Sequence, residues 1–175
     1  MQGSTYNAMQ ILTKFFHTTG KIYPSSDRPL TLHAVFTDGA EVIGESHIAG
    51  YKGMIDHVYV TNTYDDQKPQ ASRKVVQTIL DSDMVVLGPG SLFTSILPNL
   101  VIEEIGQALL ETEAQIAYVC NIMTQRGETE HFTDANHVEV LHRHLGEKFI
   151  DTVLVNIENV PQEYMNSNQF DEYLV

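Results

Sequence analysis

Two glycines and three hydroxyl side chains follow a short apolar run at residues 84–87 that is predicted to form a buried strand. The segment reads Gly88-Pro89-Gly90-Ser91-Leu92-Phe93-Thr94-Ser95. Glycine lets a backbone approach a ligand closely, and amides and hydroxyls can donate to phosphate oxygens without a positively charged side chain. We expect Gly90 and Ser91 to hold a phosphate. The alternative is a plain tight turn, because Gly-Pro-Gly is common turn chemistry and no standard phosphate-loop pattern is present.

A second loop, residues 121–130, collects amide, hydroxyl, guanidinium and carboxylate groups after another apolar run. Asn121 and Gln125 can each donate and accept hydrogen bonds, which suits the hydroxyls of a sugar or the edge of a base. The alternative is a solvated loop in which Thr129 or Asp134 caps the next helix. Two such loops after neighbouring strands together favour a ligand site.

Metal and nucleophile chemistry have weaker support. His131, His137, His142 and His144 show neither i, i+4 spacing nor an H-E-x-x-H pattern, so we expect no metal site. Cys120 closes an apolar run and is expected to be a buried, inert thiol. Residues 90–94 do not form the G-x-S-x-G turn of a serine hydrolase. The sequence assigns no catalytic residue.

The composition narrows the class of protein. The 175 residues include 10 Lys and Arg against 23 Asp and Glu, a net charge of −13 that disfavours nucleic acids and anionic membranes as partners. Hydrophobic residues make up 42% of the chain, yet no apolar run reaches the roughly 20 residues of a membrane helix. One cysteine excludes an internal disulfide framework, and the first residues lack a signal-peptide pattern, so we expect a cytoplasmic protein.

The elements before these loops are predicted from hydrophobic spacing. Apolar residues recur at helical intervals over 8–19, with Gly20 as the stop. Asp38-Gly39 lies between the extended runs 32–36 and 41–48, which predicts an antiparallel hairpin. A short strand at 58–60 follows, and Pro69 is expected to open the next helix.

An alternating pattern follows and positions the two loops. Strands are predicted at 84–87, 116–120 and 153–155, with helices that include Ile102 to Leu110 and residues 135–145. Such alternation predicts right-handed βαβ crossovers and a parallel sheet. Ligands of these sheets bind at the carboxyl ends of the strands, where both loops begin.

The two loops also carry a family resemblance. Residues 83–100, which contain Gly88-Pro89-Gly90-Ser91-Leu92-Phe93-Thr94-Ser95, and residues 118–129, which read Tyr-Val-Cys-Asn-Ile-Met-Thr-Gln-Arg-Gly-Glu-Thr, resemble the YvcK branch of the YvcK/CofD-like family, the gluconeogenesis factors. The similarity extends over essentially the whole chain. Met123-Thr124-Gln125 favours this branch over the CofD branch.

The resemblance implies a fold, a cellular location and a ligand. It implies an α/β fold with a Rossmann-like, mostly parallel sheet and an inserted antiparallel hairpin, in a bacterial cytoplasmic protein that binds a UDP-sugar such as UDP-N-acetylglucosamine. The branch is linked to gluconeogenic growth, cell shape and cell-wall precursor control, and no reaction is attached to it. The CofD branch is the alternative: a 2-phospho-L-lactate transferase that uses a nucleotide-activated substrate and Mg²⁺. Family members self-associate, so a homodimer is expected.

The expected ligand site combines both loops. Around the diphosphate and the sugar or base we place Gly88, Pro89, Gly90, Ser91, Thr94, Ser95, Asn99, Asn121, Met123, Thr124, Gln125, Gly127, Glu128 and Thr129. Under the transferase alternative, Glu128 and Asp134 are the acids to test as metal ligands. A third hypothesis is an interaction scaffold without a ligand, which would bind partners through exposed apolar residues such as Phe15 and Phe16.

Two departures from the family are expected to matter. Members begin with a strand and a glycine-rich nucleotide loop and continue beyond the position of Val175, so we expect one incomplete α/β domain over 1–175, with the antiparallel insert at 30–61 and the βαβ core at 68–156. A sheet without its first strand would expose an edge and an apolar face. Many relatives have proline where this chain has Arg126, so a phosphate role for Arg126 rests on its chemistry alone.

Overall fold

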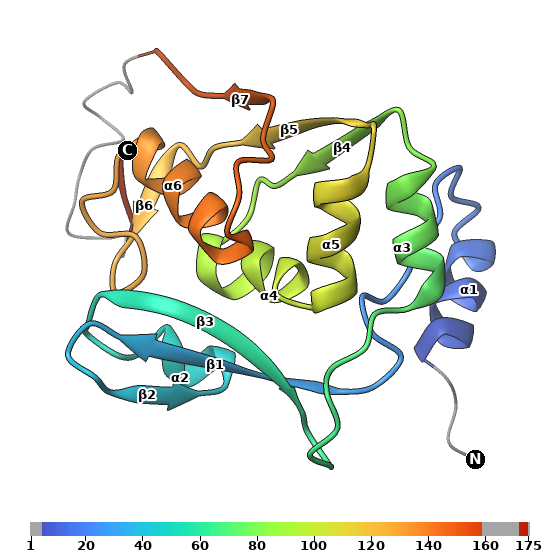
Figure 1. Cartoon of the computed structure of the whole chain (residues 1–175), viewed down its shortest axis with the longest axis horizontal. Helices are drawn as coiled ribbons and strands as arrows, with labels where there is room; N and C mark the ends of the chain where they lie inside the picture. Colours follow the sequence, from blue (N-terminus) through green and yellow to red (C-terminus); the bar gives the residue numbers. More distant parts are fainter. Residues whose placement is uncertain (1–4, 159–171, 175) are drawn as a thin grey trace.

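Two sheets enclose a layer of helices in the computed structural model, which describes residues 5–158 and 172–174 (Figure 1). The parallel sheet has the order β4-β5-β7, the antiparallel sheet has the order β2-β1-β3, and β6 and β8 form a separate pair. The elements are α1 (Thr5–Phe15), β1 (Leu30–Phe36), β2 (Glu41–Ile43), α2 (Glu45–Ile48), β3 (Ile55–Asn62), α3 (Arg73–Leu80), β4 (Met84–Leu87), the π-helix η1 (Leu92–Ile96), α4 (Leu97–Leu100), α5 (Glu103–Glu111), β5 (Gln115–Val119), β6 (Met123–Gln125), α6 (Asp134–Leu145), β7 (Thr152–Leu154) and β8 (Glu172–Leu174).

The parallel sheet confirms the predicted α/β core. Met84 pairs with Gln115 and Ala117 pairs with Thr152, both in parallel register. Each crossover between these strands contains at least one helix, α5 in the first and α6 in the second. The carboxyl ends of β4 and β5 therefore meet at one edge of the sheet, as the strand-helix alternation predicts.

The antiparallel part is larger than a hairpin. β1 pairs with β2 across the turn at 37–40 and also with β3, where Leu30 lies opposite Asn62. Gly39 has a φ of 86°, so a residue without a Cβ fits this turn. The second strand of the hairpin ends early: Gly44 has a φ of 91°, and residues 45–48 form α2 instead of the extended run expected there.

Two predicted helix boundaries were wrong. The first helix covers 5–15, and the chain turns at His17, with a φ of 51°, before it reaches Gly20. α3 begins at Arg73 and not at Pro69. The reason is tertiary: the amide of Ser72 donates to the Ser25 carbonyl at 2.9 Å, which ties the segment before α3 to the N-terminal part of the chain.

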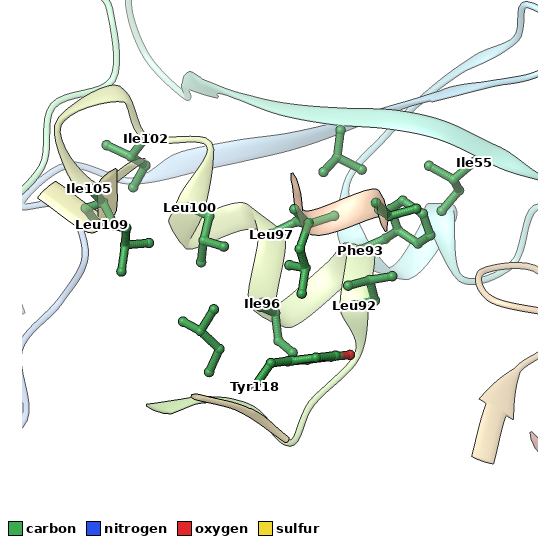
Figure 2. Packing of buried hydrophobic residues seen from close by; sticks show 14 of the residues in the cluster. Ile55, Leu92, Phe93, Ile96, Leu97, Leu100, Ile102, Ile105, Leu109 and Tyr118 are labelled. Atoms are coloured by element: carbon green, nitrogen blue, oxygen red, sulfur yellow. The ribbon is translucent and has the colours of Figure 1, made fainter. Parts of the chain in front are cut away.

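The core lies between the sheets and is centred on η1, α4 and α5 (Figure 2). Phe93 and Leu97 are fully buried, and Tyr118 from β5 lies beneath them at 0% exposure. Apolar side chains from β3, including Ile55 and Val58, close the core from the antiparallel side. Because η1 starts directly after the Gly88–Ser91 loop, this packing fixes where the loop lies.

One face of the parallel sheet stays open. Val85 and Leu87 of β4 point into the core, whereas Met84 and Val86 on the opposite face are 54% and 55% exposed. Leu154 of β7 is 54% exposed as well. Within the described residues β4 pairs only with β5, so the expected exposed edge and apolar face are confirmed.

Candidate functional site

Asn121 joins the two strand-end loops. Its side-chain Nδ2 donates to the Gly90 carbonyl at 2.9 Å, and its Oδ1 accepts from the Gly90 amide at 3.3 Å. The Gly90 amide is therefore already bonded within the protein. Ser91 and the hydroxyls after it remain the candidate phosphate donors of this loop.

The two glycines of the first loop have different structural roles. Gly88 has a φ of 81°, and a Cβ there would lie 3.0 Å from the Val119 carbonyl oxygen, so the fold itself needs glycine. A Cβ on Gly90 would meet only Ser95 Cβ at 3.5 Å and Ile96 Cγ1 at 3.8 Å, which are ordinary contacts. Gly90 is thus dispensable for the fold and suits a functional test. Pro89 is exposed beside it.

Thr94 and Glu128 make a second connection between the loops. The Thr94 hydroxyl lies 3.3 Å from Glu128 Oε1, and Glu128 is only 5% exposed. Burial raises the pKa of the Glu128 carboxyl, the Thr94 hydrogen bond opposes this, and the nearby charge of Glu45 raises the pKa further. A desolvated carboxyl of this kind is common at functional sites and also occurs in structural networks.

A tight turn shapes the second loop. The Gln125 amide donates to the Thr129 hydroxyl at 2.9 Å, and the Thr129 amide donates back to the Gln125 carbonyl at 2.9 Å. Between them Gly127 has a φ of 79°, and a Cβ there would lie 2.9 Å from the Tyr51 carbonyl oxygen. The turn is therefore built against the loop before β3.

Part of the expected loop is a strand. Met123, Thr124 and Gln125 form β6, which pairs antiparallel with β8. Thr124 is 1% exposed, and its hydroxyl, like the Oε1 of Gln125, is buried without a hydrogen-bond partner in the described part of the chain. Hydrogen bonding between distant segments made this strand, so three residues of local sequence could not reveal it.

Asn99 lies apart from the second loop. Its Nδ2 donates to the Ser95 carbonyl at 2.7 Å, and its Oδ1 accepts from the Ser25 hydroxyl. Asn99 and Thr94 line a cavity of about 470 Å³ between α4 and the antiparallel sheet. Ser95 itself is exposed. Of the predicted first-loop residues, the structure brings Gly90 and Thr94 into contact with the second loop.

Cys120 is the buried thiol that the sequence predicts. It is 5% exposed, and its Sγ donates to Asp134 Oδ1 at 3.3 Å. Burial and the Asp134 hydrogen bond raise the pKa of the thiol to about 11, which disfavours the nucleophilic thiolate. Asp134 is the first residue of α6, and the helix cap is Thr133, paired with Asn136.

Metal ligands do not gather in the described ranges 5–158 and 172–174, where no three His, Cys, Asp or Glu side chains stand close enough to share an ion. In the same ranges no helix is long and apolar enough to cross a membrane. Glu128 and Asp134, the acids of the transferase alternative, bond instead to Thr94 and to Cys120.

Sequence reasoning missed a cavity of about 650 Å³ beside the second loop. Residues 49–54 line one side of it, and Arg126, Gly127, Glu128, Glu130 and His131 line the other. No motif marks Lys52 or Tyr51. The only local signal was the glycine spacing of Gly50-Tyr51-Lys52-Gly53, which indicates a loop and says nothing about what it faces.

The chain has a parallel α/β sheet with joined loops at the carboxyl ends of two neighbouring strands, which is the edge where α/β proteins of this class commonly bind ligands. The comparisons give the family: the model of the 2-phospho-L-lactate transferase CofD family matches residues 1–174, and this chain belongs to that family.

Relatives sharpen the assignment. A "Putative gluconeogenesis factor" of Streptococcus pneumoniae is 82% identical over all 175 residues, and a "Gluconeogenesis factor" of Bacillus subtilis is 41% identical over 161 residues, 92% of this chain. The chain spans 54% and 50% of these two proteins, about half their length. A crystal structure of a UPF0052 family member from Bacillus halodurans superimposes with a TM-score of 0.92 at 32% identity, covering 99% of this chain and 55% of that one.

Proposed function

We propose that this chain contributes the strand-end loops of a nucleotide-sugar site in a regulatory protein of the gluconeogenesis-factor type. The ligand class is a UDP-sugar such as UDP-N-acetylglucosamine. The protein would act in the bacterial cytoplasm, in carbon metabolism, cell shape and the supply of cell-wall precursors, and as a homodimer. Support comes from the names of the relatives and from the joined loops.

The observation that carries the proposal is the contact between the loops. Asn121 holds Gly90, and Thr94 holds Glu128, so residues 31 and 34 positions apart meet at the carboxyl edge of the sheet. Hydrogen bonds that order two loops before a ligand arrives lower the entropy cost of binding. In this proposal Ser91 donates to the diphosphate, and Glu128, which the Thr94 hydroxyl holds in place, accepts from a sugar hydroxyl.

A thermal-stability titration tests this proposal. UDP-N-acetylglucosamine, UDP and GTP would be titrated against this chain and against the longer Streptococcus pneumoniae relative. A ligand at about 100 times its dissociation constant adds about 2.7 kcal/mol to the native state. We expect stabilisation by the uridine compounds. Absence of any nucleotide effect on either protein would contradict the proposal and favour the scaffold hypothesis.

A matched glycine pair locates the site. Gly90→Val should abolish the nucleotide effect because a branched side chain blocks backbone approach. Gly20→Val is the control, since a Cβ on Gly20 meets nothing within 4 Å. Unchanged affinity in Gly90→Val, with the fold verified by circular dichroism, would remove the first loop from the site.

The description of the family model favours one alternative, a CofD-like 2-phospho-L-lactate transferase. Mg²⁺ is usually held by one or two carboxylates together with substrate phosphates, and Glu128 would be the carboxylate here. Incubation with a deazaflavin, a guanosine-activated phospholactate and Mg²⁺ tests for the product. Selective stabilisation by GTP would support this alternative, whereas no turnover would count against it.

A further inference from the structure

Two segments far apart in the sequence enclose the cavity of about 650 Å³ beside the second loop. Tyr51 and Lys52 come from the loop between α2 and β3, and Arg126 and Glu128 come from the turn after β6. A volume of this size accommodates a small molecule. The cavity is separate from the Gly88–Ser91 loop. Glu128 connects the two regions, because it lines the cavity and also accepts a hydrogen bond from Thr94.

Two cations of the cavity are not neutralised. Arg28, Lys68 and Arg143 each form an ion pair with an acid, whereas Lys52 and Arg126 have no ion-pair partner within 4.0 Å in the part of the chain that the structure describes. The chain as a whole carries a net charge of −13. Glu128 and Glu130 also line the cavity, so its formal charges balance. Neither acid lies within 4.0 Å of Lys52 or Arg126 among the described residues, so both cations stay available to a phosphate group.

A buried carboxyl accompanies these cations. Glu128 lines the cavity and is 5% exposed. Among the described residues only the Thr94 hydroxyl donates to it, at 3.3 and 3.4 Å from its two oxygens. An ionised carboxylate can accept about four hydrogen bonds. Glu128 therefore has unused acceptor capacity in a place where water is largely excluded, which suits a ligand hydroxyl.

The walls of the cavity are held in place without a ligand. Gly127 packs so closely on Tyr51 that a Cβ would lie 2.9 Å from the Tyr51 carbonyl oxygen. The Tyr51 hydroxyl donates to Asp38 Oδ2 at 2.8 Å, and the ring centroids of Tyr51 and Phe36 are 4.3 Å apart. A site ordered in advance loses little entropy when it binds.

We propose that this cavity binds a sugar phosphate, a small phosphate monoester that carries hydroxyl groups. The phosphate faces Lys52 and Arg126, and Glu128 accepts from a hydroxyl of the sugar. This is a second ligand site of the chain. It shares Glu128 with the nucleotide-sugar proposal, but neither Lys52 nor Arg126 takes part in the contacts between the two strand-end loops, so the cations distinguish the two sites.

Isothermal titration of the chain with glucose 6-phosphate, inorganic phosphate and glucose tests the site. We expect glucose 6-phosphate to bind more tightly than inorganic phosphate, and glucose not to bind. The double variant Lys52→Ala/Arg126→Ala should bind both phosphates at least about tenfold more weakly, because charge-assisted hydrogen bonds are lost. Arg73→Ala/Lys74→Ala is the matched control, since it removes two exposed cations from α3 and should leave binding unchanged.

Glu128→Gln separates the role of the carboxyl from that of the cations. This variant should still bind inorganic phosphate but lose most of the preference for glucose 6-phosphate, because an amide oxygen is a weaker acceptor than a carboxylate. Equal affinities of the chain and the Lys52→Ala/Arg126→Ala variant for glucose 6-phosphate would overturn the proposal. No binding of glucose 6-phosphate to the folded chain at about 10 mM would overturn it too, whatever the nucleotide titrations give.

Discussion

Gly127→Ala is the most informative single change, because it acts on the contact between the second loop and the segment before β3. Gly127 has a φ of 79°, a backbone conformation that costs an L-residue roughly 1–2 kcal/mol. The added Cβ would also lie 2.9 Å from the Tyr51 carbonyl oxygen, which belongs to the backbone and moves only if the whole loop moves. Both costs reduce the free energy of unfolding.

Gly39→Ala separates these two costs. Gly39 has a similar φ of 86°, and a Cβ there meets nothing within 4 Å, so only the backbone cost applies. We expect Gly39→Ala to cost about 1 kcal/mol. Gly127→Ala should cost about 3 kcal/mol, because forcing an atom into a packed contact typically adds roughly 1–3 kcal/mol.

Urea unfolding followed by circular dichroism measures both free energies, and thermal melts provide a second reading. The expected difference of about 2 kcal/mol between the variants corresponds to about 4–8 °C in Tm for a chain of this size. If Gly127→Ala is no more destabilising than Gly39→Ala, the two loops are not in the close contact that the structure shows. The cavity between them would then lose its basis.

Four further predictions concern single side chains. His144 is held neutral by burial, which lowers its pKa, and its Nε2 accepts from the Val58 amide at 3.2 Å. The unfolded chain therefore takes up the proton first, so stability should fall as the pH drops below about 6.5, and His144→Gln should flatten this dependence in urea titrations. Asn121→Ala should cost about 1–3 kcal/mol through its two lost hydrogen bonds; a neutral result would refute the loop contact. With a thiol pKa of about 11, Cys120 should react with iodoacetamide at pH 8 far more slowly in the folded chain than in urea, and equal rates would contradict its burial. Leu154→Lys on the open sheet face should change stability by less than about 0.5 kcal/mol while reducing light scattering from aggregates; a larger loss of stability would mean that this face is covered.

Local sequence predicted the core elements well. Residues 84–87 and 153–155 are apolar runs between loop signals, and both correspond to strands of the parallel sheet. The Asp38-Gly39 pair predicted the turn between β1 and β2 for the same reason, because the conformational preference of a turn residue is a local property. These signals depend on neighbours within a few positions, so they can be read without the fold.

Structural features that depend on residues distant in the sequence could not be predicted from the sequence. β6 exists because residues 123–125 pair with 172–174, and the start of α3 is delayed because Ser72 bonds to Ser25. The spacing of Asn121 and Gly90 gave no sign that one side chain holds the backbone of the other. Such pairings are set by packing and not by propensity.

The residue types of this chain determined by themselves that it is acidic, that it forms an α/β sheet, and that two polar loops leave the carboxyl ends of neighbouring strands. Hydrophobic periodicity and net charge depend only on the residue types and their order, so they can be read from the sequence without a structure. Only the tertiary structure decided that Gly127 packs on Tyr51 and that Lys52 and Arg126 share a cavity with Glu128. These juxtapositions result from close packing of two loops that are distant in the sequence, with Gly127 76 positions after Tyr51, and no short sequence pattern encodes them.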